Sequence, residues 1–356
     1  MRRREFAMTP AEARAFLADQ ATFHLATTTA DGQPLLRTLH GVIVDDVLAF
    51  HSAPKGEKTG ALGRPAVAVA EEVVATVPST FFDPVKACPA TTYYRSVSVH
   101  GVIEELTAPD LKARALQALM EKLQPDGGYR AITAADPMYR PAVTGLLVAG
   151  LRLERVDGKA KLAQNRSPAE LAALVTSLWR RGDAGDPRAI ELVRAANPGM
   201  PTPAFLAAPA GVALHPWLPA AAAADAAALL DGTYWNTGFT RAQLAAAHRG
   251  SPVWVGARDP AGALVGSARA ITDGAKRAWI YDVIVAPAWR GRGVGKALTR
   301  LVLDHPLIRA TATVMLGTRD AQGLYAGFGF VDVAARPPRG FTTTDMVLVR
   351  DAPAAG

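Results

Sequence analysis

Apolar and polar positions alternate along much of the first 160 residues, a pattern typical of strands that bury one face. It predicts strands over residues 23–29, 35–44, 47–52, 66–77, 93–106 and 145–156, and helices over residues 9–20, 109–123, 168–181 and 187–196. Asp31-Gly32 and Asp45-Asp46 are turn signals between the first three strands. A meander of antiparallel strands favours a small β-barrel with flanking helices.

The pattern changes after residue 196. Six prolines and few charges lie between Asn197 and Pro219, which indicates an interdomain segment. Strands over residues 253–258, 264–272, 279–285 and 312–316 and a helix over 293–303 then predict a mixed α/β fold. We therefore expect a first domain over residues 1–196, a Pro/Ala-rich linker over 197–211, and a second domain over 212–356.

Composition narrows the class of protein. The 356 residues are 49% hydrophobic and 20% charged, which is typical of globular proteins. A net charge of +7 favours anionic ligands such as nucleotides and phosphates. We expect no nucleic-acid partner, because there is no dense basic arm or helix-turn-helix. One cysteine, no metal-ligand spacing and no leader or membrane-spanning run predict a cytoplasmic protein without metal or disulfide.

The most informative stretch runs from Asp282 to Lys296. A predicted strand ends at Pro287, and a glycine-rich turn opens directly into a helix. Glycine allows positive φ and close approach of the backbone to a ligand. Free amides at the start of a helix, together with its dipole, bind anions. Arg290, Arg292 and Lys296 add positive charge, so the turn suits a pyrophosphate.

The spacing Arg290-x-x-Gly293-x-Gly295 is neither the dinucleotide motif nor a P-loop. It resembles motif A of the GNAT acetyltransferases, where this turn binds coenzyme A. The resemblance implies acetyl-CoA as cosubstrate, a small-molecule amine as acceptor, and backbone amides near the strand end that polarise the thioester. The implied cofactor-binding residues are Val283, Ile284, Val285, Arg290, Gly291, Arg292, Gly293, Val294, Gly295 and Lys296.

The segment from Thr318 to Phe330 resembles the next GNAT motif, a short helix with a tyrosine before Gly-Phe. That resemblance assigns Tyr325 as the proton donor to the departing thiolate. Asp282 stands where some relatives place a carboxylate toward the acceptor, as a base, an amine anchor or a strand-end carboxylate. The aromatic residues of 234–238 either line the acceptor pocket or pack.

Basic and polar residues gather at strand ends of the first domain. One strand carries Arg37-Thr38-Leu39-His40, and another runs from Phe50 through His51 and Ser52 to Lys55 and Lys58. These strands, with the strand around Tyr93–Gly101, resemble the split barrel of the pyridoxamine 5'-phosphate oxidase-like superfamily, and residues 158–166 resemble its PaiB-like branch.

The resemblance implies FMN bound at the seam of a homodimer, with heme or deazaflavin as alternatives. By it, the phosphate contacts are Arg37, Lys55 and Lys58, and the ring and ribityl contacts are Thr38, Leu39, His51 and Ser52. His51 is equally consistent with a barrel-rim histidine. Ser96 stands where true oxidases of vitamin B6 carry glutamine, so we do not expect that reaction.

Two functions follow from the combined resemblance. One is a bifunctional enzyme, a GNAT N-acetyltransferase joined to a flavin-binding domain that acts as a reductase. The other is a flavin-sensing regulator whose barrel controls the acetyltransferase or DNA. A barrel that serves only for dimerisation is a third reading.

Overall fold

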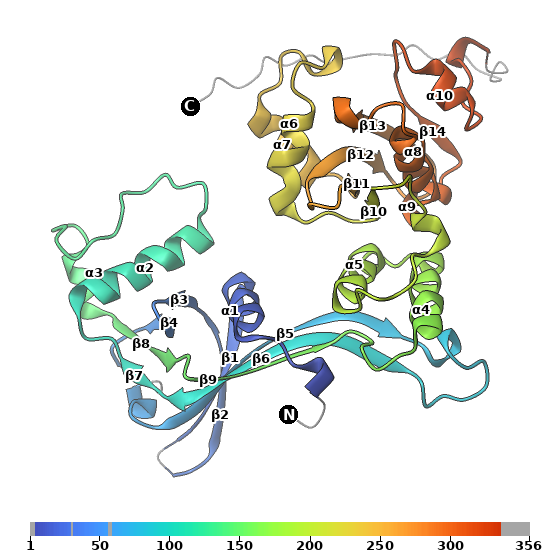
Figure 1. The fold of residues 1–356 in the computed structure, drawn as a ribbon. Helices are drawn as coiled ribbons and strands as arrows, with labels where there is room; N and C mark the ends of the chain where they lie inside the picture. Colours follow the sequence, from blue (N-terminus) through green and yellow to red (C-terminus); the bar gives the residue numbers. More distant parts are fainter. Residues whose placement is uncertain (1–3, 30, 56–58, 336–356) are drawn as a thin grey trace.

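A computed structural model describes residues 4–29, 31–55 and 59–335 of the chain. Three sheets organise it (Figure 1). The first has the order β2-β1-β5-β6-β9, with β1 Thr22–Thr28, β2 Pro34–His40, β5 Pro65–Val77, β6 Thr91–Val102 and β9 Arg155–Lys161. The second has the order β3-β4-β8-β7, with β3 Val42–Val44, β4 Val47–Ser52, β7 Glu104–Glu105 and β8 Leu147–Arg152.

Every strand pair of these two sheets is antiparallel, as the meander predicts. Phe23, Leu25, Leu48 and Phe50 bury their side chains between the sheets, and α1 Pro10–Asp19 closes one end of this core. The α1 helix begins at a capping box of Thr9 and Glu12. The first part of the chain is therefore an antiparallel barrel of two sheets.

Gly41 splits the predicted strand over residues 35–44 into β2 and β3. A Cβ atom at Gly41 would lie 2.3 Å from the Phe23 ring, so only glycine fits at this bend. The single strand predicted over 145–156 is wrong. The chain forms β8 and β9 there, in different sheets, because residues 153–154 turn without any glycine or proline to signal it.

Helices connect and cover the barrel. They are α2 Pro109–Leu123, α3 Arg140–Gly145, α4 Pro168–Arg181 and α5 Asp186–Ala196. In Figure 1 the long strands β5 and β6 extend beyond the barrel, and α4 and α5 lie between this extension and the third sheet. The helix pair thus lies at the junction of the two parts of the molecule.

The third sheet has the order β10-β11-β12-β13-β14, and only the β13–β14 pair is parallel. Its strands are β10 Ala213–His215, β11 Val253–Arg258, β12 Leu264–Thr272, β13 Arg277–Val285 and β14 Thr313–Met315. Its helices are α6 Ala223–Leu229, α7 Arg241–Arg249, α8 Val294–Asp304, α9 Pro306–Arg309 and α10 Gln322–Ala326. The mixed α/β class predicted for this region is confirmed.

The two faces of this sheet are covered by different helices. Leu298, Leu301 and Val302 of α8 pack on one face, and α6 and α7 pack on the other beside Trp254 and Ile284. In the described part of the chain, no helix has the length and apolarity needed to cross a membrane.

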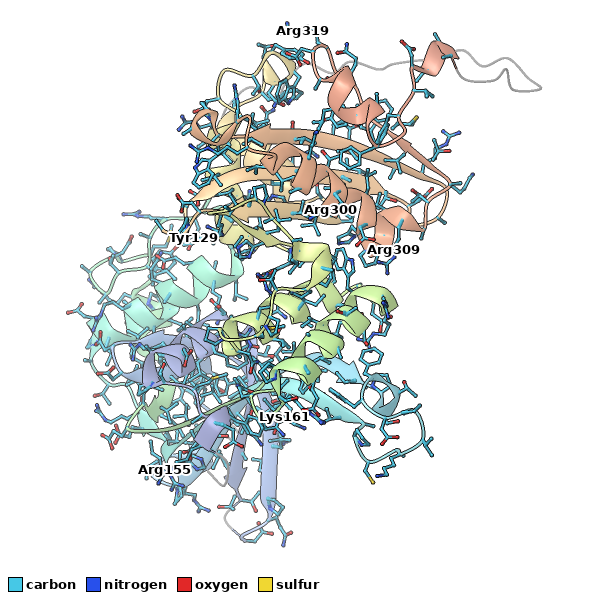
Figure 2. All side chains as sticks on the ribbon, turned by 45° about the vertical axis from the view of Figure 1, so that its right-hand side comes forward. Tyr129, Arg155, Lys161, Arg300, Arg309 and Arg319 are labelled. Atoms are coloured by element: carbon cyan, nitrogen blue, oxygen red, sulfur yellow. The ribbon has the colours of Figure 1, made fainter. Side chains whose placement is uncertain are left out.

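One hydrophobic core crosses the junction. It runs from Val77 and Tyr93 through Leu178 of α4 to Val302 and Ile308 beneath the third sheet. Trp179 donates its indole N–H to Asp304 at 2.6 Å, and the Arg309 guanidinium donates to the carbonyls of Trp179 and Arg180. Figure 2 shows Arg309 at this junction and Arg319 at the opposite end of the C-terminal region.

Candidate functional site

The turn between β13 and α8 holds a row of backbone amides without acceptors. The first hydrogen bond of the helix runs from the amide of Ala297 to the carbonyl of Gly293 at 3.0 Å. Among the described residues, the six preceding amides, from Gly291 to Lys296, donate to no group. Gly291 and Gly293 adopt φ of +73° and +86°, which only glycine adopts readily and which aligns these amides.

Charged side chains frame the same turn. Arg290 donates from Nε to the carbonyl of Val285 at 3.0 Å and so fixes the turn against the strand end. The Arg292 guanidinium lies 5.0 Å from the Trp289 ring centre, and Lys296 is on the first turn of α8. Amides without acceptors, the positive end of a helix and nearby cations are the groups that favour binding of an anion.

The strand before the turn parts from its neighbour. β14 pairs only with Arg277–Trp279 of β13, and no described strand pairs on that side with residues 283–285. Ile284 is buried against α6 and α7, while Val283 and Val285 are half-buried on the other face. β13 is therefore unpaired on this side beside Val283, Ile284 and Val285, whose contacts with a cofactor stay predictions.

Asp282 lies at a bulge of β13, with φ of +51°. Its side chain is only 3% exposed and accepts hydrogen bonds from three residues. Arg269 of β12 donates to Oδ2 at 2.6 Å, and Trp235 and Asn236 donate to Oδ1 at 3.1 and 3.2 Å. The segment 234–238 thus reaches this carboxylate, a contact that the sequence did not predict.

Tyr325 lies on α10 and is 8% exposed. Among the described residues its hydroxyl has no hydrogen-bonding partner, and its ring meets Phe330 edge to face at 5.9 Å. Burial raises the pKa of the Tyr325 phenol, and the nearby Tyr234 and Asp320 raise it further. The hydroxyl therefore stays protonated at neutral pH and is available to donate a proton.

Two residues of this site were not foreseen. Arg319 donates its backbone N–H to the Tyr234 hydroxyl at 3.0 Å and stacks its guanidinium 3.7 Å from that ring centre. Arg269 neutralises Asp282 and lies 4.8 Å from the Tyr281 ring centre. An arginine inside the otherwise apolar strand 264–271 was the available signal for a buried partner.

The described residues proposed for a flavin lie on β2, at the end of β4 and just after β4. Arg37 and Thr38 are exposed on the edge strand β2, where Arg37 donates to the Leu36 carbonyl at 2.8 Å. The Thr38 hydroxyl lies 3.2 Å from Nδ1 of His24. The strands β2 and β4 are in contact with each other.

The proposed flavin contacts at and after the end of β4 differ in how exposed they are. His51 and Lys55 are exposed and Ser52 is half-buried, so all three are accessible to a ligand. Leu39 is 8% exposed and packs in the barrel core, which corrects the expectation that its side chain lines a flavin ring. Only the backbone of Leu39 is left as a contact. Lys58 lies outside the described residues.

Family models decide the relationship of both parts. A model described as "Acetyltransferase (GNAT) family" matches residues 221–330, and one described as "Pyridoxamine 5'-phosphate oxidase" matches residues 9–160. The chain has one region that matches each family, one after the other. It is an oxidase-like domain followed by a GNAT domain.

Three solved structures illustrate the similarity. A protein of the GNAT family from Xanthomonas campestris pv. campestris is 31% identical, covers 36% of this chain and 92% of its own, and has a TM-score of 0.31. A conserved hypothetical protein from Mycobacterium tuberculosis is 20% identical; the match covers 46% of this chain and 92% of that protein, with a TM-score of 0.36. The FAD and heme binding protein from Mycobacterium smegmatis is 20% identical; the match covers 48% of this chain and 80% of that protein, with a TM-score of 0.38. No curated protein matches the chain.

The GNAT match contains the β13–α8 turn, Asp282 and Tyr325, and the oxidase-like match contains Arg37 through Lys58. The helices α4 and α5 and the segment up to β10 lie in neither match. They connect the GNAT domain to the oxidase-like domain through the shared core described above.

Proposed function

We propose that the GNAT domain transfers an acetyl group from acetyl-CoA to the amine of a small molecule. The observation that carries this proposal is the row of six acceptor-free amides at the positive end of α8, with Arg290, Arg292 and Lys296 around it. These groups match the two negative charges of a diphosphate. The parted strands β13 and β14 leave amides near Val283 and Val285 to polarise a thioester carbonyl.

Tyr325 supplies the proton in this proposal. As the amine nitrogen bonds to the acetyl carbon, the carbon–sulfur bond breaks and the electron pair stays on sulfur. The Tyr325 hydroxyl, protonated and without a described partner, gives its proton to that thiolate. The attacking nitrogen loses a proton to solvent, and the Tyr325 phenolate takes a proton from solvent, which restores the hydroxyl.

We assign Asp282 a positioning role. Three donors surround its two oxygens and almost none of its surface is exposed, so it has little room to take a proton from an acceptor. It holds Trp235 and Asn236 against the bulged strand. Trp235 is 40% exposed and Tyr281 37%, and both lie beside this carboxylate where an acceptor amine would dock.

Replacement of Tyr325 tests the proton transfer. We expect Tyr325→Phe to lower kcat by about 100-fold or more, because general acids contribute at least that much, and to leave acetyl-CoA affinity unchanged. Steady-state assays against a panel of amines give kcat, and calorimetry gives affinity. Tyr139→Phe, which removes a hydroxyl bonded to the Arg130 carbonyl far from this site, is the matched control. Full activity in Tyr325→Phe contradicts the assignment.

We also infer that the oxidase-like domain binds a flavin, with FMN as the first choice over FAD. Arg37, Lys55 and Lys58 are the proposed phosphate ligands, and Thr38, His51 and Ser52 the polar contacts. The support is the exposure of Arg37, His51 and Lys55 near the contact of β2 with β4. A bound flavin would supply two-electron redox chemistry to a reductase. The exposed edge strand β2 supports a homodimer in which a second copy completes the site.

Flavin titration tests this second activity. We expect the purified chain to bind FMN, with a visible absorbance band and quenched flavin fluorescence. Arg37→Met should lower that affinity by about 10-fold, because it removes a charge-assisted contact to phosphate. Arg155→Met, at another exposed arginine of the same domain, should not change it. Colourless protein that cannot be reconstituted with FMN or FAD contradicts the inference.

A further inference from the structure

One face of the third sheet is only partly covered. The helices α6 and α7 bury Trp254 and Ile284 on this face, whereas Ile271 of β12 and Trp279 and Tyr281 of β13 stay exposed on it. Their exposed fractions are 51%, 36% and 37%, although neither strand is at the edge of the sheet. An exposed patch of large apolar side chains often marks a binding surface. We call these three residues the apolar platform.

The strand register brings the platform residues together. Ile271 is directly opposite Trp279, and Tyr281 is directly opposite Arg269, so each pair shares one face of the sheet. The Trp279 and Tyr281 rings are 6.0 Å apart between their centres and 24° from parallel. Because side chains alternate along a strand, Ile280 points to the opposite face and packs in the core beside α8. The platform is therefore one continuous surface.

The platform adjoins the proposed acetyl-transfer site. The Arg269 guanidinium lies 4.8 Å from the Tyr281 ring centre and donates to Oδ2 of Asp282 at 2.6 Å. Val283, whose amide we propose to polarise the thioester, is the next residue along β13 after Asp282. At about 3.3 Å per strand residue, Tyr281 lies about 7 Å from Val283 and Trp279 about 13 Å. A ring on the platform thus places an amine beside the acetyl group when a short chain joins the two.

The area of the platform fits a small molecule and not a protein. Aromatic side chains carry about 150–250 Å² of surface each, so the exposed fractions leave on the order of 250 Å² accessible. A stable interface between two proteins buries about 800 Å² on each partner. Two fused aromatic rings are small enough to lie on this area, and nearly parallel rings offer offset stacking to a third ring.

We propose that the apolar platform binds the body of the acetyl acceptor, and that this acceptor is a primary amine joined by a short chain to an aromatic ring system. The inference rests on the proposed acetyl transfer and narrows its acceptor class. The reaction is unchanged: the acceptor nitrogen bonds to the acetyl carbon, the carbon–sulfur bond breaks, and Tyr325 protonates the sulfur. Arg269 contacts both Tyr281 and Asp282, so it positions the ring-binding surface relative to the site of transfer.

The test compares acetylation of tryptamine, which carries two fused rings, with that of butylamine, which has the same reacting group and no ring. We expect kcat/KM to be about 10-fold or more higher for tryptamine, through a lower KM, because its rings are buried on the platform. Trp279→Ala and Tyr281→Ala should each lower kcat/KM about 10-fold more for tryptamine than for butylamine. Tyr281→Phe keeps the ring and should keep the preference. Met138→Ala, at an exposed apolar residue of the first domain, should change neither value.

Calorimetry with tryptamine on the intact chain, without acetyl-CoA, measures binding apart from turnover. Wild type should bind tryptamine, and Trp279→Ala should bind it about 10-fold more weakly. If neither amine is acetylated while tryptamine still binds in this way, the proposed acetyl transfer is wrong and the platform stands. Equal kcat/KM for the two amines, or no binding of tryptamine at millimolar concentration, overturns the platform. A dimer that Trp279→Ala dissociates in sedimentation assigns this face to a second copy and overturns it as well.

Discussion

At the scale of single residues, burial decides the charge state of His305. Its pKa falls from an ordinary value of 6.5 to about 4, chiefly because the ring is buried and also because Arg309 is near. Above pH 6.5 the folded and unfolded chains both carry a neutral ring. As the pH falls from 6.5 toward 4, only the unfolded chain takes up the proton, so stability is lost in this window.

We therefore expect the free energy of unfolding to fall by up to about 3 kcal/mol from this residue between pH 7 and pH 4. Denaturant titrations at several pH values measure it. His305→Asn keeps an acceptor for the Leu307 amide, which His305 now caps at 3.3 Å, and should flatten the pH dependence. His40→Asn, at an exposed histidine, should not. Identical pH profiles for wild type and His305→Asn would falsify this account.

The sequence indicated residues of the proposed acetyl-transfer site but not their partners. Asp282 and Tyr325 were proposed from local motifs, because their neighbours along the chain are characteristic, and their roles stay predictions. Arg269 lies 13 residues from Asp282 and was missed, since pairing across β12 and β13 depends on a bulge that no local pattern marks.

At the scale of elements, the turn before α8 depends on one glycine more than on the other. Gly293 precedes the helix with φ of +86°, whereas Gly295 lies inside it with ordinary helical geometry. A Cβ atom at Gly295 would meet Val285 at 3.8 Å, an ordinary contact. A side chain at position 293 would strain the backbone and one at position 295 would not, so alanine at each position gives a matched pair of variants.

Gly293→Ala should lower stability by about 1–2 kcal/mol and weaken acetyl-CoA binding by about 10-fold or more, because alanine resists the left-handed conformation that aligns the amides. Gly295→Ala should raise stability by roughly 0.5–1 kcal/mol and keep binding. Thermal unfolding and calorimetry give both quantities. If the two variants behave alike, the geometry assigned to this turn is wrong.

Regular elements followed the sequence closely where capping or periodicity was strong. The predicted helix over 168–181 is α4, with a capping box of Ser167 and Glu170, and β11 and β12 have the predicted bounds. The alanine-rich helix α6 was not predicted, because alanine gives no apolar stripe against a polar face. The turn between β8 and β9 was missed, because residues 153–154 contain no glycine or proline.

At the scale of the whole molecule, the sequence predicted two domains but not how closely they join. Residues 197–211 were predicted to be a linker between the domains, yet Leu206 is 1% exposed within the shared core. The boundaries at 196 and 212 remain predictions. Because the core is continuous from β5 to α9, we propose that the domains act as one body, with α4 and α5 between them.

The central claim is that the amides of residues 291–296 bind a diphosphate. Calorimetry of the full chain with acetyl-CoA and with S-acetylpantetheine, which has the same thioester but no diphosphate, tests it most directly. We predict one acetyl-CoA bound per chain and an affinity for S-acetylpantetheine at least about 100-fold weaker, because charge-assisted contacts to the diphosphate are lost. No binding of acetyl-CoA, or equal affinity for the two compounds, would contradict the account.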